Sequence, residues 1–234
     1  MAKSGSSIKI KMIVIPPRVA NRNRDLCSRL PFCYHIGMIS KVKIGISSCL
    51  LGENVRYDGG NRLDNIIIAA FDQLAEWAPV CPEVECGLPV PREAMRLTGD
   101  PDKPRLVTKV SGIDHTERMT AWAMKKVEHL KKEGLCGFIF KSRSPSSGLR
   151  DIEICTSSGE PSGKGTGIFA GIFIKSMPLM PVEDDIGIHD PVIWQNFIKK
   201  VIEFKRMHRY DTETGKYDDN IICFNGHCKR SEAI

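Results

Sequence analysis

The stretch Val42-Lys43-Ile44-Gly45-Ile46-Ser47-Ser48-Cys49-Leu50-Leu51-Gly52 decides the fold class of this 234-residue chain. Its first six residues alternate and carry β-branched side chains, which predicts a strand, and the small polar residues after them predict a loop. A second short strand is expected at residues 78–80, with Cys81 directly after it. Between the two strands, Asp64 is typical of the cap of a helix, here over about residues 65–77. A strand–helix–strand unit of this kind has parallel strands, so both loops should lie at one edge of a sheet.

The pattern of a strand followed by a loop continues downstream. A buried strand is expected at residues 137–141, followed by a loop of small residues at 142–148. Residues 152–155 have the pattern of a further short strand. Three strand ends thus present loops at one edge, where open α/β sheets hold their ligands. We therefore predict an α/β fold, in the form of a Rossmann-like three-layer domain with a mainly parallel sheet.

The spacing of apolar residues predicts the other main elements. Asp114 is expected to open a long helix that Gly134 ends, and Asp190 to cap an amphipathic helix over residues 191–207. Prolines and glycines predict irregular structure where they cluster. The remaining expectations are an irregular stretch at 89–104 with a strand at 105–110 inside the same excursion, a glycine-rich start of a helix within 164–174, and an edge strand at 178–181.

We divide the chain into three parts. Residues 41–182 are expected to form the α/β domain. Residues 1–40 are interpreted as a leader that is disordered or not native, because its apolar run is short and broken and because Met38 offers a second start. Residues 183–234 are interpreted as a helical extension with a loose tail, the truncated start of a second domain.

The charge of the chain is concentrated in the leader. The net charge is +6, and residues 1–37 hold seven basic side chains and one acidic one, which leaves 27 of each sign in residues 38–234. A neutral body gives no argument for a nucleic-acid partner. No stretch approaches the length of a membrane span, and the chain has no export signal. We therefore expect a cytoplasmic protein that does not bind membranes, and the sequence contains no direct nucleic-acid signal.

Nine cysteines are many for such a chain, and unpaired thiols in a reducing compartment indicate metal binding or catalysis more than disulfides. Cys136 and Cys155 lie beside or within strand-like runs and are expected to be small buried hydrophobes. Four cysteines in the two tails are discounted similarly: Cys27, Cys33, Cys223 and Cys228. The candidates that remain all lie in loop-like sequence, and they are Cys49, Cys81 and Cys86.

The sequence around Cys81 holds further polar candidates. The gap between Cys81 and Cys86 is the four-residue gap of plant-type ferredoxins, which alone is a weak signal. Glu83 lies between them and is a candidate general base, although a solvated loop glutamate would look the same in sequence. Asp58 lies in a Tyr-Asp-Gly-Gly turn and is a candidate for the edge of the site. Three arginines could either orient a ligand or pair with surface acids: Arg56, Arg92 and Arg143.

Two other kinds of site are weakly supported. The loop 142–148 could cradle a phosphate or offer its hydroxyls to a substrate, but it lacks the Gly-Lys-Ser/Thr ending of a P-loop. His115 and His129 lie fourteen residues apart on one predicted helix, too far to bind one ion together. The sequence therefore argues against a zinc protease.

Four ordered motifs between residues 44 and 148 carry a resemblance to a known family. They are Ile46-Ser47-Ser48-Cys49-Leu50-Leu51-Gly52, Val55-Arg56-Tyr57-Asp58-Gly59, Cys81-Pro82-Glu83-Val84 with Gly87-Leu88-Pro89-Val90-Pro91-Arg92, and Lys141-Ser142-Arg143-Ser144-Pro145-Ser146-x-Gly148. Together they resemble the thiouracil desulfidase (2-thiouracil desulfurase) family, formerly a bacterial domain of unknown function. The resemblance continues more weakly to about residue 181.

The resemblance implies a [4Fe-4S] cluster held by three cysteines, with one iron left open to take the sulfur of a thiolated pyrimidine. Cys49 and Cys81 match the first two ligands. The third family cysteine falls at Ser147, and a serine is a poor ligand for a soft metal. Cys86 stands where the family often has glycine, which suggests a relocated ligand, so the expected metal set is Cys49, Cys81 and Cys86. This paired change resembles longer members that are fused to a second helical domain.

The resemblance also implies roles for polar residues. Glu83 would activate a water and Ser144 would hold the ring, with Asp58, Arg143 and Ser146 as further substrate contacts. The function predicted is an iron–sulfur-dependent desulfidase that cleaves the C–S bond of a thiolated pyrimidine or a related small thiocarbonyl compound, with a thiolated base or nucleoside as its partner. The alternative is a non-enzymatic iron–sulfur or metal-sensing module, in which the serine at the third ligand position signals lost catalysis. Retention of Glu83 and Ser144 favours the enzyme.

Overall fold

A computed structural model describes residues 41–156 and 158–207, together with strands between residues 210 and 230. The expectation for the leader, and the four tail cysteines, lie outside the residues whose side chains are described. The described part of the chain contains two four-stranded sheets, which differ in strand direction, and two small two-stranded sheets. The predicted α/β class is confirmed.

The first sheet is entirely parallel and has the strand order β2-β1-β5-β8. β1 and β2 pair along their whole length, from Val42 opposite Ala75 to Ser47 opposite Val80. The bounds of the strands are β1 (Val42–Ser47), β2 (Ala75–Val80), β5 (Gly137–Phe140) and β8 (Val182–Asp184).

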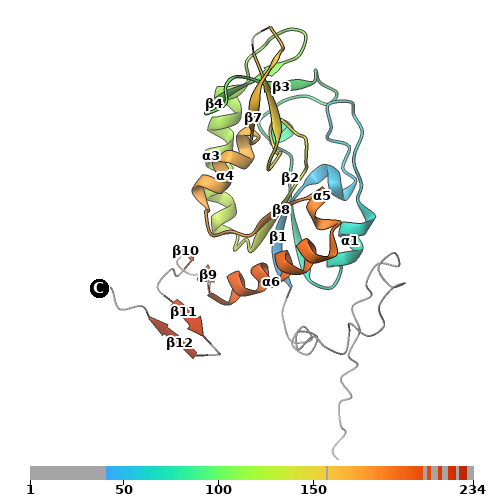
Figure 1. Cartoon of the computed structure of the whole chain (residues 1–234). Helices are drawn as coiled ribbons and strands as arrows, with labels where there is room; N and C mark the ends of the chain where they lie inside the picture. Colours follow the sequence, from blue (N-terminus) through green and yellow to red (C-terminus); the bar gives the residue numbers. More distant parts are fainter. Residues whose placement is uncertain are drawn as a thin grey trace, which may run out of the picture.

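Helices cover both faces of this sheet. Neighbouring residues of a strand point to opposite faces, and β5 is buried at all four positions, so both of its faces need a covering layer. Phe138 and Phe140 of β5 pack their rings on α4 (Ile168–Ser176), which lies beside α3 (Thr116–Lys132). On the other face, a Cβ added to Gly137 would lie 2.8 Å from a methyl carbon of Val201 in α6 (Pro191–Met207). Figure 1 shows α3 and α4 on one side of β1 and β8, and α1 (Asn65–Phe71) and α6 on the other.

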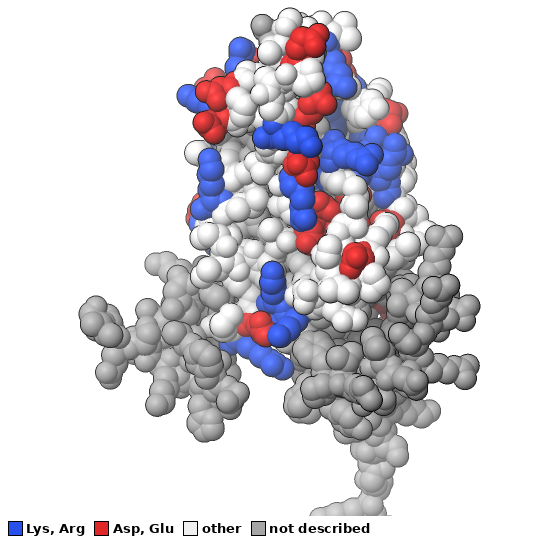
Figure 2. Space-filling model, in the orientation of Figure 1, with Lys and Arg blue, Asp and Glu red and all other residues white. Residues whose placement is uncertain are grey.

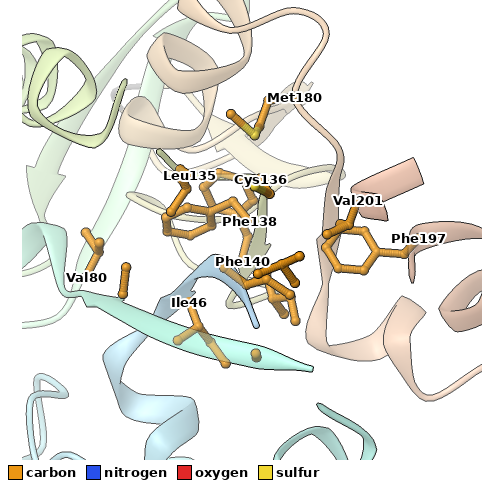
Figure 3. Close-up of a cluster of buried hydrophobic side chains, with 14 of the residues drawn as sticks. Ile46, Val80, Leu135, Cys136, Phe138, Phe140, Met180, Phe197 and Val201 are labelled. Carbon is orange, nitrogen blue, oxygen red and sulfur yellow. The ribbon is translucent and has the colours of Figure 1, made fainter. Parts of the chain in front are cut away.

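The main core lies in the two layers between this sheet and its helices. Figure 3 shows Phe138 and Phe140 at its centre, with Phe197 and Val201 of α6 approaching from one side. Cys136 is buried in the same cluster next to Leu135, so its thiol packs as a small apolar group. Each fully buried aromatic or aliphatic side chain contributes about 1.5–3 kcal/mol. Side chains of β5 alternate between the two faces of the sheet and are buried on both, which explains the predicted packing of one sheet between two layers of helices.

The second sheet is mixed, with the order β4-β3-β6-β7. β3 pairs antiparallel with β4 and parallel with β6, and β6 pairs antiparallel with β7. A smaller core that includes Leu97, Leu106 and Ile154 lies against it. The strands are β3 (Met95–Asp100), β4 (Lys103–Thr108), β6 (Ile152–Cys155) and β7 (Pro161–Gly165).

Several sequence-based bounds were wrong, and tertiary pairing explains the errors. The helix expected to reach residue 77 ends at Phe71, because residues 75–80 pair with β1. The stretch 89–104 contains strand β3, whose pairing with β4 spans a two-residue turn. The edge strand lies at Val182–Asp184 instead of 178–181, and β7 was missed because glycine-rich strands have a weak pattern.

The predicted caps Asp64 and Asp190 are confirmed, whereas α3 begins one residue later than predicted, with His115 instead of Asp114 at its N-cap position. The Asp64 carboxylate accepts the N–H groups of Ile66 and Ile67 at 3.1 and 3.0 Å. Asp190 accepts the N–H groups of Val192 and Ile193 at the start of α6, whose bounds match the prediction. α6 contributes to the main core, while the division of the chain at residue 182 stays a prediction.

Short elements complete the described chain. Near the site they are the 3₁₀ turn η3 (Ser48–Leu51), α2 (Pro82–Glu85) and α5 (Asp185–Ile188). Two separate antiparallel pairs follow α6, formed by β9 (Tyr210–Asp211) with β10 (Lys216–Tyr217) and β11 (Ile221–Phe224) with β12 (His227–Arg230). None of the helices in the described ranges has the length and apolar character needed to cross a membrane. On the face of the molecule seen in Figure 2, basic and acidic side chains are interleaved over the described surface.

Candidate active site

All four parallel strands end at one edge of the first sheet, and the candidate residues follow those ends. η3 carries Cys49 two residues after β1, and α2 begins after Cys81 at the end of β2. The loop 141–148 follows β5, and α5 starts with Asp185 at the end of β8. Because neighbouring strands lie about 4.8 Å apart, these four segments meet.

α2 turns the side chain of Glu83 back toward the Cys81 thiol. Cys81 caps this short helix, and its backbone N–H donates to Glu85 Oε1 at 2.9 Å. Glu85 also forms an ion pair with Lys126 of α3, at 3.0 Å, which fixes the turn to a long helix. Cys81 Sγ lies 3.6 Å from Glu83 Oε2. The thiol and the carboxylate are therefore neighbours, as a metal ligand and a general base would have to be.

The carboxylate of Glu83 is held at both of its oxygens. Ser146 Oγ donates to Oε1 at 2.5 Å, and Arg92 Nη2 lies 3.8 Å from Oε2. Arg92 is itself buried, and its Nη2 donates to the Val55 carbonyl at 3.0 Å. The side chain of Glu83 is 13% exposed. Glu83 is thus a positioned carboxylate instead of a solvated one.

The loop at residues 141–148, called the serine loop below, is folded around Ser144. Its Oγ accepts the N–H groups of Ser146 and Ser147 at 3.3 and 3.2 Å, and its carbonyl accepts the N–H of Gly148 at 2.7 Å. Ser144 Oγ also lies 3.0 Å from Ser146 Oγ. Ser144 is half-buried, whereas Ser146 and Ser147 are buried. The loop therefore offers one partly exposed hydroxyl, that of Ser144.

Two predicted substrate contacts lie on the exposed side. Arg143 has a left-handed backbone, with φ of 57°, and its exposed side chain makes no hydrogen bond or ion pair with the described residues. Strained conformations of this kind are common at functional sites. Asp58 is exposed and accepts the N–H of Gly60 at 3.0 Å, a bond that lowers the pKa of its carboxyl together with the charge of Arg56. The structure does not bring Asp58 against Glu83.

The sequence reasoning missed an ion pair that anchors the serine loop. Lys141 Nζ lies 2.6 Å from Asp185 Oδ2, and the N–H of Ser142 donates to Asp185 Oδ1 at 2.6 Å. The N–H of Lys141 donates to Ser47 Oγ of β1 at 2.9 Å. In open α/β sheets, ligand sites lie at the carboxyl ends of the strands. Asp185 directly follows the strand Val182–Asp184, so a correct placement of that strand would have identified it.

Burial keeps the two best candidate thiols neutral. It raises the pKa of Cys49 to about 11, opposed by the nearby charge of Lys141. Burial, and next the Glu83 carboxylate, raise the pKa of Cys81 to about 12. The pKa of Cys86 is raised by the same two causes in the same order. Because a metal binds the thiolate, a metal held by these cysteines would displace their protons.

The donor set consists of thiols, which are chemically suited to a soft metal. Cys49, Cys81 and Cys86 are all free thiols. Within the described ranges, no three His, Cys, Asp or Glu side chains are grouped closely enough to hold one metal ion. A [4Fe-4S] cluster is larger and takes its thiolates on different irons, so its ligands lie further apart and can come from separate loops. Thiols at the ends of two neighbouring parallel strands fit that requirement.

Cys86 and Ser147 occupy different sides of this arrangement. Cys86 lies at the C-terminal end of α2 and packs against the smaller core. Its S–H group donates a hydrogen bond to the backbone carbonyl of Glu83, with Sγ 3.2 Å from the oxygen. Ser147 is buried within the serine loop, and its Oγ lies 3.5 Å from Ser146 Oγ. Ser147 is therefore near the Glu83 carboxylate, whereas Cys86 is connected to the backbone of Glu83.

The fold and site define an α/β domain whose parallel strand ends gather thiols, a held carboxylate and a serine loop. Residues 44–185 match the model of the 2-thiouracil desulfurase family, and the chain belongs to that family. A solved structure of a [4Fe-4S]-dependent thiouracil desulfidase, TudS, is 27% identical and superimposes with a TM-score of 0.51, covering 67% of this chain and 99% of that one. No curated protein matches the chain.

Proposed function

We propose that this protein is a [4Fe-4S]-dependent desulfidase that replaces the sulfur of a thiolated pyrimidine, or of a related small thiocarbonyl compound, by oxygen. The observation that carries the proposal is the Glu83 carboxylate, held by Ser146 and Arg92 within 3.6 Å of the Cys81 thiol. A general base needs this kind of fixed geometry more than a particular sequence context. Family membership and the 27% identical desulfidase support the same reaction class.

In this proposal Cys49, Cys81 and Cys86 hold the cluster. The first two are buried thiols at neighbouring strand ends, and Cys86 ends the short helix that Cys81 begins. A bound cluster supplies a Lewis acid for the thiocarbonyl sulfur. A soft centre requires soft donors, which is why a thiol is preferred to the hydroxyl of Ser147 as the third ligand.

The remaining chemistry falls to the chain's own polar groups. Glu83 takes a proton from the water that attacks the thiocarbonyl carbon, so that the C–S bond breaks and sulfur leaves as sulfide. The half-buried hydroxyl of Ser144 hydrogen-bonds the ring. Arg143 and Asp58, both exposed, contact the substrate from the solvent side. The partner is a small thiolated base or nucleoside.

The test is anaerobic purification, a count of iron and sulfide per chain, and turnover of 2-thiouracil to uracil and sulfide. Glu83→Gln should keep its iron and lose about 10²- to 10⁴-fold in rate, as a general base does. Glu76→Gln, an exposed carboxylate on β2, is the matched control and should keep full activity. A wild-type chain that stays free of iron after reconstitution would end the proposal. A loaded chain that turns over no thiolated base or nucleoside would favour the cluster-sensing alternative.

The ligand set has its own test. Cys86→Ser should lose the cluster, because two thiolates rarely hold a cubane, and adding Ser147→Cys to that variant should restore it. Cys136→Ser is the control, since this thiol lies in the main core and should affect only stability. Full iron content in Cys86→Ser would remove Cys86 from the ligand set and leave the cluster itself in place.

A further inference from the structure

We propose that Ser146 is a positioning residue: its hydroxyl fixes the carboxylate of Glu83 and does not contact the substrate. The inference rests on the proposed function, in which Glu83 is the base. It departs from the sequence-based role of Ser146 as a substrate contact and separates its task from that of Ser144, two residues earlier.

The hydrogen bond of Ser146 leaves it no donor for a substrate. A serine hydroxyl carries one hydrogen, and an ionised carboxylate can only accept, so the 2.5 Å contact with Glu83 Oε1 uses that hydrogen. Ser146 is also completely buried. A substrate that approached the edge of the sheet would meet neither its surface nor its proton.

Ser144 lies next to Ser146 and is the serine that remains available to a substrate. Its oxygen accepts two backbone N–H groups, of Ser146 and Ser147, and lies 3.0 Å from Ser146 Oγ. Since the Ser146 hydrogen points to Glu83, the hydrogen between the two serines belongs to Ser144. The donors therefore run in one direction, from Ser144 to Ser146 to Glu83, and each bond strengthens the next. Because Ser144 is half-buried, a ligand can reach its hydroxyl, and the Ser144 hydrogen can then turn from Ser146 to the ligand while the Ser146–Glu83 bond stays in place.

The backbone of Ser146 is held firmly enough to serve as a support. Its carbonyl accepts the N–H groups of Phe169 and Ala170, at 2.9 and 3.3 Å, at the start of α4. A Cβ added to Gly167 would lie 2.5 Å from the carbonyl carbon of Ser146, so the two segments touch without space between them. A positioning group requires a support of this kind, locked by packing and by its own hydrogen bonds.

Without Ser146, the remaining contacts of Glu83 would draw its carboxylate elsewhere. Arg92 Nη2 and Cys81 Sγ both lie on the side of Oε2, at 3.8 and 3.6 Å, and neither touches Oε1. Loss of the Ser146 bond thus leaves one oxygen without a partner in a side chain that is mostly buried. The carboxylate would rotate toward the guanidinium, away from its productive direction.

The kinetic test uses the loaded full-length chain and 2-thiouracil. Ser146→Ala should lower kcat about 10- to 100-fold, as misplacement of a catalytic group does, with KM changed less than about twofold. Iron content and the visible spectrum should stay at wild-type values. In a Glu83→Gln background, Ser146→Ala should cause no further loss, because there is no base left to position. A raised KM with unchanged kcat, or losses that multiply in the double variant, would overturn the proposal.

Ser142→Ala is the matched control in the same loop. Ser142 is buried, and its Oγ lies 3.0 Å from Lys141 Nζ instead of near Glu83. Any effect of Ser142→Ala should multiply with that of Glu83→Gln, since the two groups do not act through each other. If Ser142→Ala and Ser146→Ala behave alike in this cycle, the effect belongs to loop packing and the proposal is wrong.

A second measurement does not depend on activity. Urea unfolding of wild type, Ser146→Ala, Glu83→Ala and the double variant forms a cycle, and the double variant should be less destabilised than the sum of the single ones. Additive changes would show that Ser146 and Glu83 are uncoupled and would overturn the inference. If the wild-type chain turns over no thiolated base while the cycle still shows coupling, the desulfidase proposal fails and the Ser146–Glu83 bond stands.

Discussion

The two sheets have four strands each, but only the parallel sheet gathers the candidate site. In β2-β1-β5-β8 every carboxyl end lies at one edge, so segments far apart in sequence meet there. In β4-β3-β6-β7 most neighbours are antiparallel, and their connections are divided between both ends of the sheet. The comparison shows that strand direction alone decides which sheet can bring several loops to one point.

Burial follows the same division. β5 is buried at all four positions, as expected of a strand with helices on both faces, whereas β7 is exposed or half-buried throughout. Changes in the first sheet should therefore affect both the site and the main core. Equivalent changes in the second sheet should affect mainly its own smaller core, against which Cys86 packs.

The largest difference is expected for the thiols at the strand ends. Cys49→Ser or Cys81→Ser should abolish iron binding, because each removes one of the three proposed ligands. Cys155→Ser, at the end of β6 in the mixed sheet, should keep full iron content. Iron and sulfide counts on anaerobically purified protein check this result. Equal iron loss in all three variants would mean that the two sheets do not differ as the comparison requires.

Glycine substitutions test the packing of the two sheets. A Cβ at Gly45 of β1 would lie 2.2 Å from Cδ2 of Phe138, whose ring is packed against Phe140 and Phe173, so Gly45→Ala should cost about 3 kcal/mol in the free energy of unfolding. Gly163→Ala in β7 meets only Pro101, at 2.9 Å on an outer strand, and should cost less than about 1 kcal/mol. Urea unfolding of both variants gives the two values, and similar values would contradict the difference in burial.

Ion pairs give a smaller contrast. Asp185→Asn weakens two charge-assisted hydrogen bonds to Lys141 and Ser142 and should cost about 1.5–3 kcal/mol. Asp114 pairs with Arg105 of β4, whose side chain is 61% exposed, so Asp114→Asn should cost less than about 1 kcal/mol. The free energy of unfolding of both variants, measured at neutral pH, tests this difference. A larger loss for Asp114→Asn than for Asp185→Asn would contradict it.

The pH dependence of Asp185 is the smallest expected effect. Burial raises the pKa of its carboxyl, but the hydrogen bonds from Lys141 and Ser142 outweigh burial and hold it below the ordinary 3.8. A lowered pKa means that the folded state favours the ionised form, so this contribution is present above pH 3.8 and is lost as the pH falls through the lower folded value. The stability difference between wild type and Asp185→Asn should therefore shrink in acid. A difference that stays constant down to the acid transition would contradict this account.

The sequence predicted β1 and β5 of the parallel sheet well because their signals are local, whereas the start of β2 and the position of β8 were wrong. The rule that loops after parallel strands meet correctly placed Cys49 and Cys81 after the ends of β1 and β2, and the capping position of Asp64 is confirmed. The contact between Ser146 and Glu83 joins residues 63 positions apart and depends on rotamers, which no local pattern encodes. In the mixed sheet the sequence predicted β6 at 152–155 and most of β4 within 105–110, but it missed β3 and β7. Long-range pairing, and not propensity, holds Met95–Asp100 in place.

The bonds between the serine loop and α4 also set how the site moves. The carbonyls of Pro145 and Ser146 accept the first N–H groups of α4, and Gly167 donates to the Gly148 carbonyl at 2.8 Å. The loop therefore opens only when the start of a core helix frays, and its amide protons should exchange with solvent on the slow timescale of the core.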